Sequence, residues 1–249
     1  MNYQDVNAQT IDRWVKEGWE WSKPISHEAY VRALKGDWDV LLTPTKPVPH
    51  EWFGELRGKK LLGLASGGGQ QMPVFAALQA EVTVLDYSPL QLEAERTVSR
   101  REGYSIHIVH ADMTKPFPFA DESFDLIFHP VANCYVADVR PIWKECFRVL
   151  KPGGILLSGM DNGLSFAMDA DQTHLCYTLP FDPLNNEEHR RVLEEDGSGF
   201  QFSHTIEDLI GGQLSAGFRL THIYGDNDPT GNLHDRNIYT YWATRSVKA

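Results

Sequence analysis

The chain has 249 residues, of which 42% are hydrophobic and 23% charged, as in one large globular domain with insertions or at most two small domains. The formal net charge of −11 gives a surface that repels phosphate, which argues against nucleic acids and anionic membranes as partners. Its three cysteines are widely spaced and form no Cys-x-x-Cys pair, so no zinc ribbon or disulfide scaffold is indicated and we expect a reducing, cytoplasmic setting.

The first segment, residues 1–57, is expected to be helical near residues 8–18 and 27–35. The proline-rich stretch at 43–52 is expected to be an extended connector. The segment is rich in tryptophan, and no βαβ unit needs it. Four of its aromatic residues form either a lid over a binding site or the core of a small subdomain: Trp14, Trp19, Trp21 and Tyr30.

From residue 59 onward, short apolar strands alternate with helices. The pattern predicts strands at 61–65, 82–86, 106–109, 124–128 and 155–160, and helices at 71–79, 88–102 and about 138–150. The second of these helices begins with a capping pattern, Ser88-Pro89, and is followed by Gly103. Alternation at this spacing predicts right-handed βαβ units and a parallel sheet.

The last third of the chain completes the predicted fold. Residues 161–204 are less regular and are expected to be an insertion that covers the substrate. Residues 218–226 and 237–245 alternate like two antiparallel edge strands. The predicted fold class is therefore α/β: a Rossmann-like, doubly wound sheet of seven strands, mostly parallel with an antiparallel last strand, in residues 58–249.

Residues 61–69, LLGLASGGG, place three glycines directly after a buried strand and before a helix. This order is typical of a nucleotide site, because the ligand approaches bare backbone and the N-terminus of the helix favours negative charge. Asp86 ends the second strand, where its carboxylate can accept hydrogen bonds from both ribose hydroxyls of an adenosine. The dinucleotide fingerprint G-x-G-x-x-G is broken, because Met72 stands where its third glycine belongs.

At residues 61–69 the chain resembles motif I of class I S-adenosylmethionine-dependent methyltransferases. The resemblance continues through VLDYSPLQLE, HADMTKPFPFADESFDLIF and FRVLKPGGILLSG, and so covers roughly residues 59–161. The branch it looks most like contains the ubiquinone/menaquinone-biosynthesis type. The resemblance also favours the lid interpretation of the N-terminal segment, because members of this family often cover the cofactor with such a segment.

The resemblance implies cofactor contacts from four segments. The first loop would line the methionine part, the end of the second strand would hold the ribose and adenine, the loop after the third strand would bind the adenine, and a backbone carbonyl after the fourth strand would meet the methionine amine. The first loop contributes Ala65, Ser66, Gly67, Gly69, Gln70 and Gln71, and the end of the second strand contributes Asp86 and Tyr87. The loop after the third strand contributes Asp112 and Met113, and the backbone carbonyl after the fourth strand belongs to His129.

Two positions depart from the family pattern. Gly63 replaces the usual acidic residue, and Ala65 replaces a usual glycine. In the family the acidic residue helps to place the methionine amino group, so its replacement by Gly63 leaves open which group makes that contact here. Gln70 and Gln71 either supply side-chain contacts instead or are an ordinary polar helix start.

Methyl transfer is an in-line displacement, and it requires a general base only if the acceptor must lose a proton. His129 and Tyr135 follow the fourth strand, where the family faces its substrate, and are the catalytic candidates. Asp161-Asn162 occupies the position of a magnesium-binding pair in catechol-type enzymes, but these two residues can also form a strand-ending turn. We expect the turn and no metal. Cys134 is either reactive or simply buried.

The predicted function is transfer of a methyl group from S-adenosylmethionine to a small molecule, with S-adenosylhomocysteine as product. One alternative is a non-catalytic module that binds this cofactor or a related adenosine and acts through partners. The other is an NAD(P)-dependent oxidoreductase, which the broken glycine fingerprint disfavours. The fold alone does not choose between oxygen, nitrogen, sulfur and carbon acceptors, nor does it give the oligomeric state.

Overall fold

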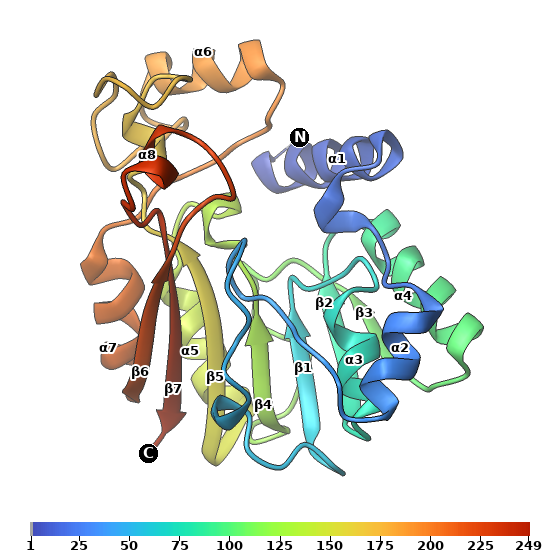
Figure 1. The fold of residues 1–249 in the computed structure, drawn as a ribbon. Helices are drawn as coiled ribbons and strands as arrows, with labels where there is room; N and C mark the ends of the chain where they lie inside the picture. The colour runs from blue at the N-terminus through green and yellow to red at the C-terminus, as the bar shows by residue number, and fades with distance from the viewer. Residues whose placement is uncertain (1) are drawn as a thin grey trace.

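A computed structural model describes residues 2–249 (Figure 1). Its centre is a seven-stranded sheet in the order β3-β2-β1-β4-β5-β7-β6. The first five strands run parallel, and β7 is antiparallel to both β5 and β6. The predicted Rossmann-like fold is therefore confirmed. The strands are β1 Lys60–Leu64, β2 Glu81–Asp86, β3 His107–His110, β4 Phe124–His129, β5 Leu150–Asp161, β6 Phe218–Asp226 and β7 Tyr241–Lys248.

Helices cover both faces of the sheet, and each face has its own apolar core. One core joins the sheet to α2, α3 and α4, and the other joins it to α5 and the helical turns before β6. The helices are α1 Tyr3–Glu17, α2 His27–Leu34, α3 Gln71–Ala77, α4 Pro89–Glu102, α5 Arg140–Val149, α6 Glu187–Asp196, α7 Gly212–Ala216 and α8 Asn232–Asp235. Short 3-10 turns lie at Glu20–Ser22, His50–Trp52, Asn133–Tyr135 and Ser165–Ala167, and a π-helical turn at Glu207–Gly211 precedes α7.

Helix α4 shows how local sequence signals set the elements. The Ser88 side chain accepts a hydrogen bond from the Gln91 N–H at 3.1 Å, and Pro89 occupies the first helical position. Gly103 ends the helix with φ +77°, a left-handed conformation that favours glycine. The predicted start and end of this helix are confirmed.

Three element boundaries differ from the predictions. Helix α1 begins at Tyr3 rather than near residue 8, because the Asn2 side chain accepts from the Asp5 N–H at 2.8 Å and caps it. Strand β5 begins at Leu150 rather than 155, because pairing with β4 continues through a register shift. Strand β7 begins at Tyr241 rather than 237, because α8 occupies the connection before it.

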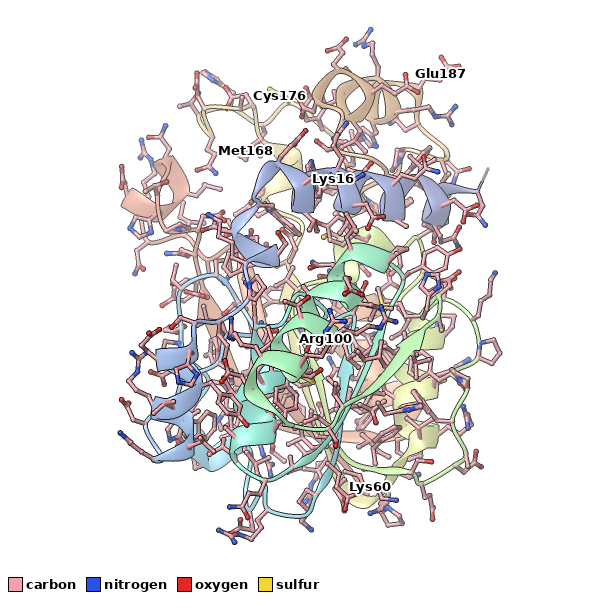
Figure 2. All side chains as sticks on the ribbon, turned by 90° about the vertical axis from the view of Figure 1, so that its right-hand side faces the viewer. Lys16, Lys60, Arg100, Met168, Cys176 and Glu187 are labelled. Carbon is pink, nitrogen blue, oxygen red and sulfur yellow. The ribbon has the colours of Figure 1, made fainter. Side chains whose placement is uncertain are left out.

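Two segments lie over the carboxyl ends of the parallel strands. Figure 2 shows α1, marked by Lys16, crossing the end of the sheet opposite Lys60, where β1 begins. In the same view Cys176 and Glu187 of the segment 161–204 lie beyond α1, on the side away from the sheet. The functional end of the sheet is therefore covered by chain from both ends of the sequence. Among residues 2–249, no helix is both long and apolar enough to cross a membrane.

Candidate active site

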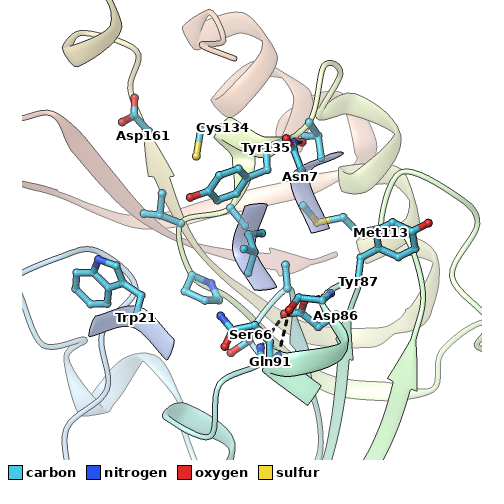
Figure 3. A pocket seen from close by; sticks show the side chains of 18 of the residues that line it. Asn7, Trp21, Ser66, Asp86, Tyr87, Gln91, Met113, Cys134, Tyr135 and Asp161 are labelled. Carbon is cyan, nitrogen blue, oxygen red and sulfur yellow. Dashed lines mark hydrogen bonds between the residues drawn. The ribbon is translucent and has the colours of Figure 1, made fainter. Parts of the chain in front are cut away.

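A cavity of about 300 Å³ lies at the carboxyl ends of β1, β2, β4 and β5 (Figure 3). The sheet order reverses direction between β1 and β4, which is where open α/β sheets bind ligands. The cavity is lined by α1, the loop 41–44, the glycine loop after β1, the ends of β2 and β3, and the segment after β4. Of the twelve residues predicted from the sequence to form the site, ten line it: Ala65, Ser66, Gly67, Gln70, Gln71, Asp86, Tyr87, Asp112, Met113 and Tyr135.

The glycine loop is held against the end of β2 and the start of α4. The Gly67 N–H donates to Asp86 Oδ2 at 3.0 Å, and the Gly68 N–H donates to the Gln91 carbonyl at 2.9 Å. A Cβ on Gly67 would lie 2.7 Å from Gln91 Cβ and 2.9 Å from Asp86 Oδ2, so no side chain fits there. The loop therefore presents bare backbone to the cavity.

The structure shows how both departures from the family pattern, Gly63 and Ala65, are accommodated. A Cβ at Gly63 would lie 2.6 Å from the Met72 sulfur and terminal methyl, so Met72 fills the space of the usual acidic side chain. Ala65 has φ +48°, in the left-handed region that alanine adopts at a cost of roughly 1–2 kcal/mol. The backbone thus keeps the conformation that a glycine would favour, although the side chain has changed.

The Asp86 carboxylate is positioned by the backbone on both of its oxygens. Oδ2 accepts from Gly67, and Oδ1 accepts from the Ser88 N–H at 2.9 Å. Each carboxylate oxygen has two acceptor sites, so Oδ1 and Oδ2 can each accept more than one hydrogen bond. Burial raises the pKa of Asp86, and the backbone hydrogen bonds from Ser88, Gly67 and Tyr87 oppose this shift. Two neighbouring acceptor oxygens at the cavity match the two hydroxyls of a ribose.

The ends of β2 and β3 form a partly apolar wall next to Asp86. Tyr87, Asp112 and Met113 all line this wall. The Tyr87 hydroxyl donates to Asp5 Oδ1 of α1 at 2.8 Å, and Asp112 Oδ1 accepts from the Thr114 N–H at 2.8 Å. The second Asp112 oxygen has no protein partner among residues 2–249, so it can accept from a ligand amine.

A buried acid lies behind the glycine loop. Glu95 of α4 is 0% exposed, and its Oε1 accepts from the Gly69 N–H at 2.8 Å. Its other oxygen is buried without a hydrogen-bond partner in the described chain. Burial, reinforced by the nearby Asp86, raises the pKa of Glu95 to about 8. Glu95 is therefore protonated near neutral pH and supports the loop from behind.

Gly69 and Gln70 connect the loop to the N-terminal segment. The Gln70 side-chain amide donates to the Glu20 and Lys23 carbonyls at 2.9 and 3.1 Å. The Gly69 carbonyl accepts from the Ile25 N–H at 2.9 Å, and Gly69 does not line the cavity. The Gly69 backbone holds Glu95 and the N-terminal segment, and its contact with the cofactor stays a prediction. Gln71 instead faces the cavity beside Ser66, with their side-chain oxygens 3.2 Å apart.

Helix α1 covers the cavity and is held at several points. The Asn7 side chain donates to the Tyr135 carbonyl at 3.1 Å and to the Phe200 carbonyl at 2.8 Å, and it accepts from the Phe200 N–H at 2.6 Å. One buried amide thus joins α1 to the segment after β4 and to the insertion before β6. The geometry agrees with a cover, whereas opening and closing of that cover stay a prediction.

The end of the cavity away from Asp86 is formed by side chains that follow β4 and β5. In Figure 3, Asp161, Cys134 and Tyr135 lie on the opposite side from Asp86 and Tyr87. Tyr241, which pairs with Asp161 between β5 and β7, lines the cavity as well, and so does Phe166. The Cys134 and Tyr135 pKa values are both raised, mainly by burial, so the thiol and the phenol are protonated and neutral.

The His129 side chain lies outside the cavity. It is 1% exposed, its Nδ1 lies 2.9 Å from the Leu64 carbonyl, and its ring packs edge-on against Trp143 of α5. Burial lowers the pKa of His129 to about 4, so the imidazole is neutral. The geometry therefore gives no support to His129 as a catalytic base, because its ring packs against α5 and does not line the cavity. Contact between its backbone carbonyl and the cofactor stays a prediction.

Asp161 and Asn162 do not form a magnesium-binding pair at the cavity. The Asn162 side chain donates to the Tyr239 carbonyl at 2.9 Å and accepts from the Leu164 N–H at 3.1 Å, so it forms a turn and does not line the cavity. Within the described part of the chain, no group of three His, Cys, Asp or Glu side chains is arranged to hold a metal ion.

Several lining residues were missed by the sequence analysis. Asn7 and Ile11 of α1 lie in a polar stretch with no motif, and Tyr241 starts a strand far from the others in sequence. The sequence pattern indicates Asp161 only as half of a metal pair. The position of Asp161 at the carboxyl end of a central strand was the available signal, because side chains there face the ligand crevice.

Comparison with known proteins identifies the family. A family model described as "Methyltransferase domain" matches residues 62–158. The chain is 44% identical over 249 residues to the "Uncharacterized methyltransferase YbaJ" of Bacillus subtilis (strain 168), covering 97% of each chain. The chain belongs to the class I S-adenosylmethionine-dependent methyltransferases. The resemblance inferred from the sequence is confirmed.

More distant methyltransferases share the cofactor domain. The "Ubiquinone/menaquinone biosynthesis C-methyltransferase UbiE" of Vibrio parahaemolyticus is 30% identical over 181 residues, or 69% of this chain and 68% of that one. The crystal structure of an S-adenosylmethionine-dependent methyltransferase from Mesorhizobium loti matches with a TM-score of 0.63 and 17% identity, covering 79% of this chain and 94% of that one. At that identity the likeness shows the fold.

The methyltransferase cavity fits the cofactor of this family. Asp86 offers two acceptor oxygens, the loop at Gly67 presents bare backbone, and the buried Gln91 side-chain oxygen has no protein partner in the described chain. The lining residues include Asp86, Asp112 and Asp161 but no Lys, Arg or His. An acidic cavity without cations suits a cationic sulfonium, and S-adenosylmethionine is the cofactor of this family.

Proposed function

We propose that this methyltransferase transfers the methyl group of S-adenosylmethionine to a small molecule that enters the end of the cavity formed after β4 and β5. The observation that carries this proposal is the single cavity that joins Asp86 to Tyr135 and Asp161 under α1. When α1 closes over the cavity it would keep water from the reacting groups, which favours an in-line displacement. The three cysteines are free thiols, which supports a reducing compartment such as the cytoplasm for this activity.

The cofactor would be held by four sets of contacts. The Asp86 carboxylate would accept from the ribose hydroxyls, and Tyr87 with Met113 would pack against the adenine. Asp112 would accept from the adenine amine. The backbone at Ala65, Ser66 and Gly67, with the Gln71 side chain, would line the methionine part.

When bound, the cofactor supplies an electrophilic methyl group on a positively charged sulfur. The chain supplies orientation and exclusion of water, through α1 above the cavity and the glycine loop below it. The Tyr135 hydroxyl is protonated, so it can donate a hydrogen bond to an acceptor molecule and orient it. We therefore propose Tyr135 as a positioning residue rather than a base.

Calorimetry with S-adenosylhomocysteine and NADH tests the proposal. We expect binding of S-adenosylhomocysteine and none of NADH, because no dinucleotide fingerprint is present. Turnover of methyl-labelled S-adenosylmethionine over a metabolite panel then separates an enzyme from a non-catalytic binding module. Binding without turnover of any acceptor would favour the module, and tight NADH binding would contradict the proposal.

A further inference from the structure

Asp161 is a buried carboxylate without a counter-charge. It ends β5, is 7% exposed and lines the cavity at the end away from Asp86. Its Oδ1 accepts from the Gly163 N–H at 2.6 Å. Within residues 2–249 no other hydrogen bond and no ion pair reaches this carboxylate, so Oδ2 is open to the cavity. A buried charge is stable only when it is paired, so the site is complementary to a cationic donor.

The protein holds Asp161 rigidly in this place. The Asn133 side chain donates to the Asp161 carbonyl at 3.0 Å and accepts from the Asp161 N–H at 2.9 Å. Asn133 is itself 1% exposed, and its own carbonyl lies 2.9 Å from His204 Nε2. The end of β5 is thus fixed to the segment after β4. A carboxylate fixed this firmly can hold a reacting group in one orientation.

The aromatic side chains of the cavity lining determine which molecules can enter. They come from different segments: Trp21, Tyr135, Phe166 and Tyr241. No Lys, Arg or His belongs to the lining, so nothing there would pair with a carboxylate or phosphate on the acceptor. Aromatic faces and one unpaired carboxylate together favour an organic cation.

We propose that Asp161 binds the ammonium group of a small, largely apolar primary or secondary amine and accepts its proton, so that nitrogen is the methyl acceptor. This inference rests on the proposed methyl-transfer function and adds the substrate class to it. It makes Asp161, and not His129, the catalytic residue beside the acceptor.

The proton step follows from burial. Burial disfavours both the carboxylate and the ammonium, so in the closed cavity the proton moves from nitrogen to Asp161 Oδ2. The N–H bonding pair stays on nitrogen as a lone pair. In the transfer this lone pair forms the new N–C bond, and the C–S bonding pair stays on sulfur. No oxidant or reductant takes part.

The groups that face Asp161 are all acidic or neutral. They are Cys134 and Tyr135 after β4, Tyr241 of β7, and Asp228 in the loop after β6. Burial raises the pKa of Asp161 to about 7, and Asp228 adds to the shift. Below that pH the carboxyl is protonated and must lose its proton before it pairs with an ammonium. Amine affinity is therefore expected to fall as pH decreases below about 7.

Calorimetry on the complex with S-adenosylhomocysteine tests the inference with three probes of similar shape: benzylamine, benzyl alcohol and benzoate. At pH 8 we expect benzylamine to bind most tightly and benzoate least. Asp161→Asn should weaken benzylamine binding at least tenfold and leave benzyl alcohol within twofold. Asp161→Glu should restore part of the benzylamine affinity. The affinity of wild type for benzylamine should decrease between pH 8 and 6, whereas that of Asp161→Asn should not.

Asp228→Asn is the matched control, because it removes a neighbouring carboxylate that does not line the cavity. It should keep benzylamine affinity at pH 8 and move the pH dependence to lower pH. Absence of benzylamine binding to the wild-type complex, tighter benzoate binding, or unchanged benzylamine affinity in a folded Asp161→Asn protein would overturn the inference. If S-adenosylhomocysteine itself fails to bind wild type, the proposed function fails first, so the two failures are distinguishable.

Discussion

The Oδ2 oxygen of Asp86 accepts a hydrogen bond from the Gly67 backbone N–H at 3.0 Å, which ties the glycine loop to the end of β2. The same carboxylate faces the cavity. The residue proposed to bind the ribose therefore also sets the conformation of the loop proposed to line the methionine part. Ligand affinity and loop geometry should depend on one side chain.

Asp86→Ala should reduce the affinity for S-adenosylhomocysteine at least tenfold. It removes hydrogen bonds to a charged group, each contributing ~1.5–3 kcal/mol. Calorimetry measures the loss, and circular dichroism checks the fold. Glu81→Ala is the control, because Glu81 is exposed at the other end of β2. Unchanged affinity in a folded Asp86→Ala protein would show that Asp86 does not hold the ribose.

Gly67→Ala should lower both the melting temperature and the cofactor affinity. The added Cβ meets Gln91 and Asp86 at 2.7 and 2.9 Å, so the loop must move even without ligand. We expect a fall of several degrees in thermal denaturation and at least a tenfold loss of affinity. In the control variant Gly211→Ala, the atom nearest to the added Cβ lies 3.9 Å away, so the melting temperature and the cofactor affinity should not change. A Gly67→Ala protein that matches wild type in both would mean that the glycines only make a turn.

Glu95→Gln should flatten the pH dependence of stability. The pKa of Glu95 is about 8 in the folded protein, above its ordinary value of 4.5. Between pH 4.5 and pH 8, Glu95 therefore carries a proton in the folded protein but not in the unfolded chain. The contribution of Glu95 to stability is therefore fully present below pH 4.5 and is lost as pH rises through 8. Between pH 6 and 9 the wild-type melting temperature should fall by several degrees more than that of Glu95→Gln. Parallel curves for the two proteins would contradict the burial argument.

Asn7→Ala should loosen the cover. It removes the side chain that joins α1 to Tyr135 and Phe200, while leaving the sheet intact. We expect faster hydrogen exchange in residues 3–17, unchanged exchange in α5 and weaker binding of S-adenosylhomocysteine. In wild type the same ligand should slow exchange in residues 1–40 more than in α5. Gln9→Ala, on the exposed side of α1, is the control. Unchanged exchange in Asn7→Ala would show that α1 is held by other contacts.

Local signals explain why much of the fold could be predicted. Ser88, Pro89 and Gly103 act within a few residues, so α4 could be placed from sequence alone. The start of α1 was missed because its first turn, residues 3–7, is mostly polar and shows no apolar periodicity. Its position depends on contacts such as that of Asn7 with Phe200, which lies in a distant part of the sequence.

The site residues also differ in how well the sequence predicts them. Asp86 and the glycine loop follow from a strand–turn–helix order, which a single stretch of sequence contains. His129 and Asp161 both end central strands, but only Asp161 faces the cavity. Successive side chains of a strand point to opposite faces, so an offset of one residue at a strand end reverses the outcome. The sequence shows where β4 and β5 end but not which way their last side chains point.

A crystal structure of the methyltransferase with S-adenosylhomocysteine tests the central claim most directly. We expect the ribose hydroxyls on the two Asp86 oxygens, the adenine between Tyr87 and Met113, and the sulfur directed toward Tyr135 and Asp161. A ligand bound elsewhere, or one bound in this cavity with its ribose away from Asp86, would show that Asp86 does not form the cofactor site.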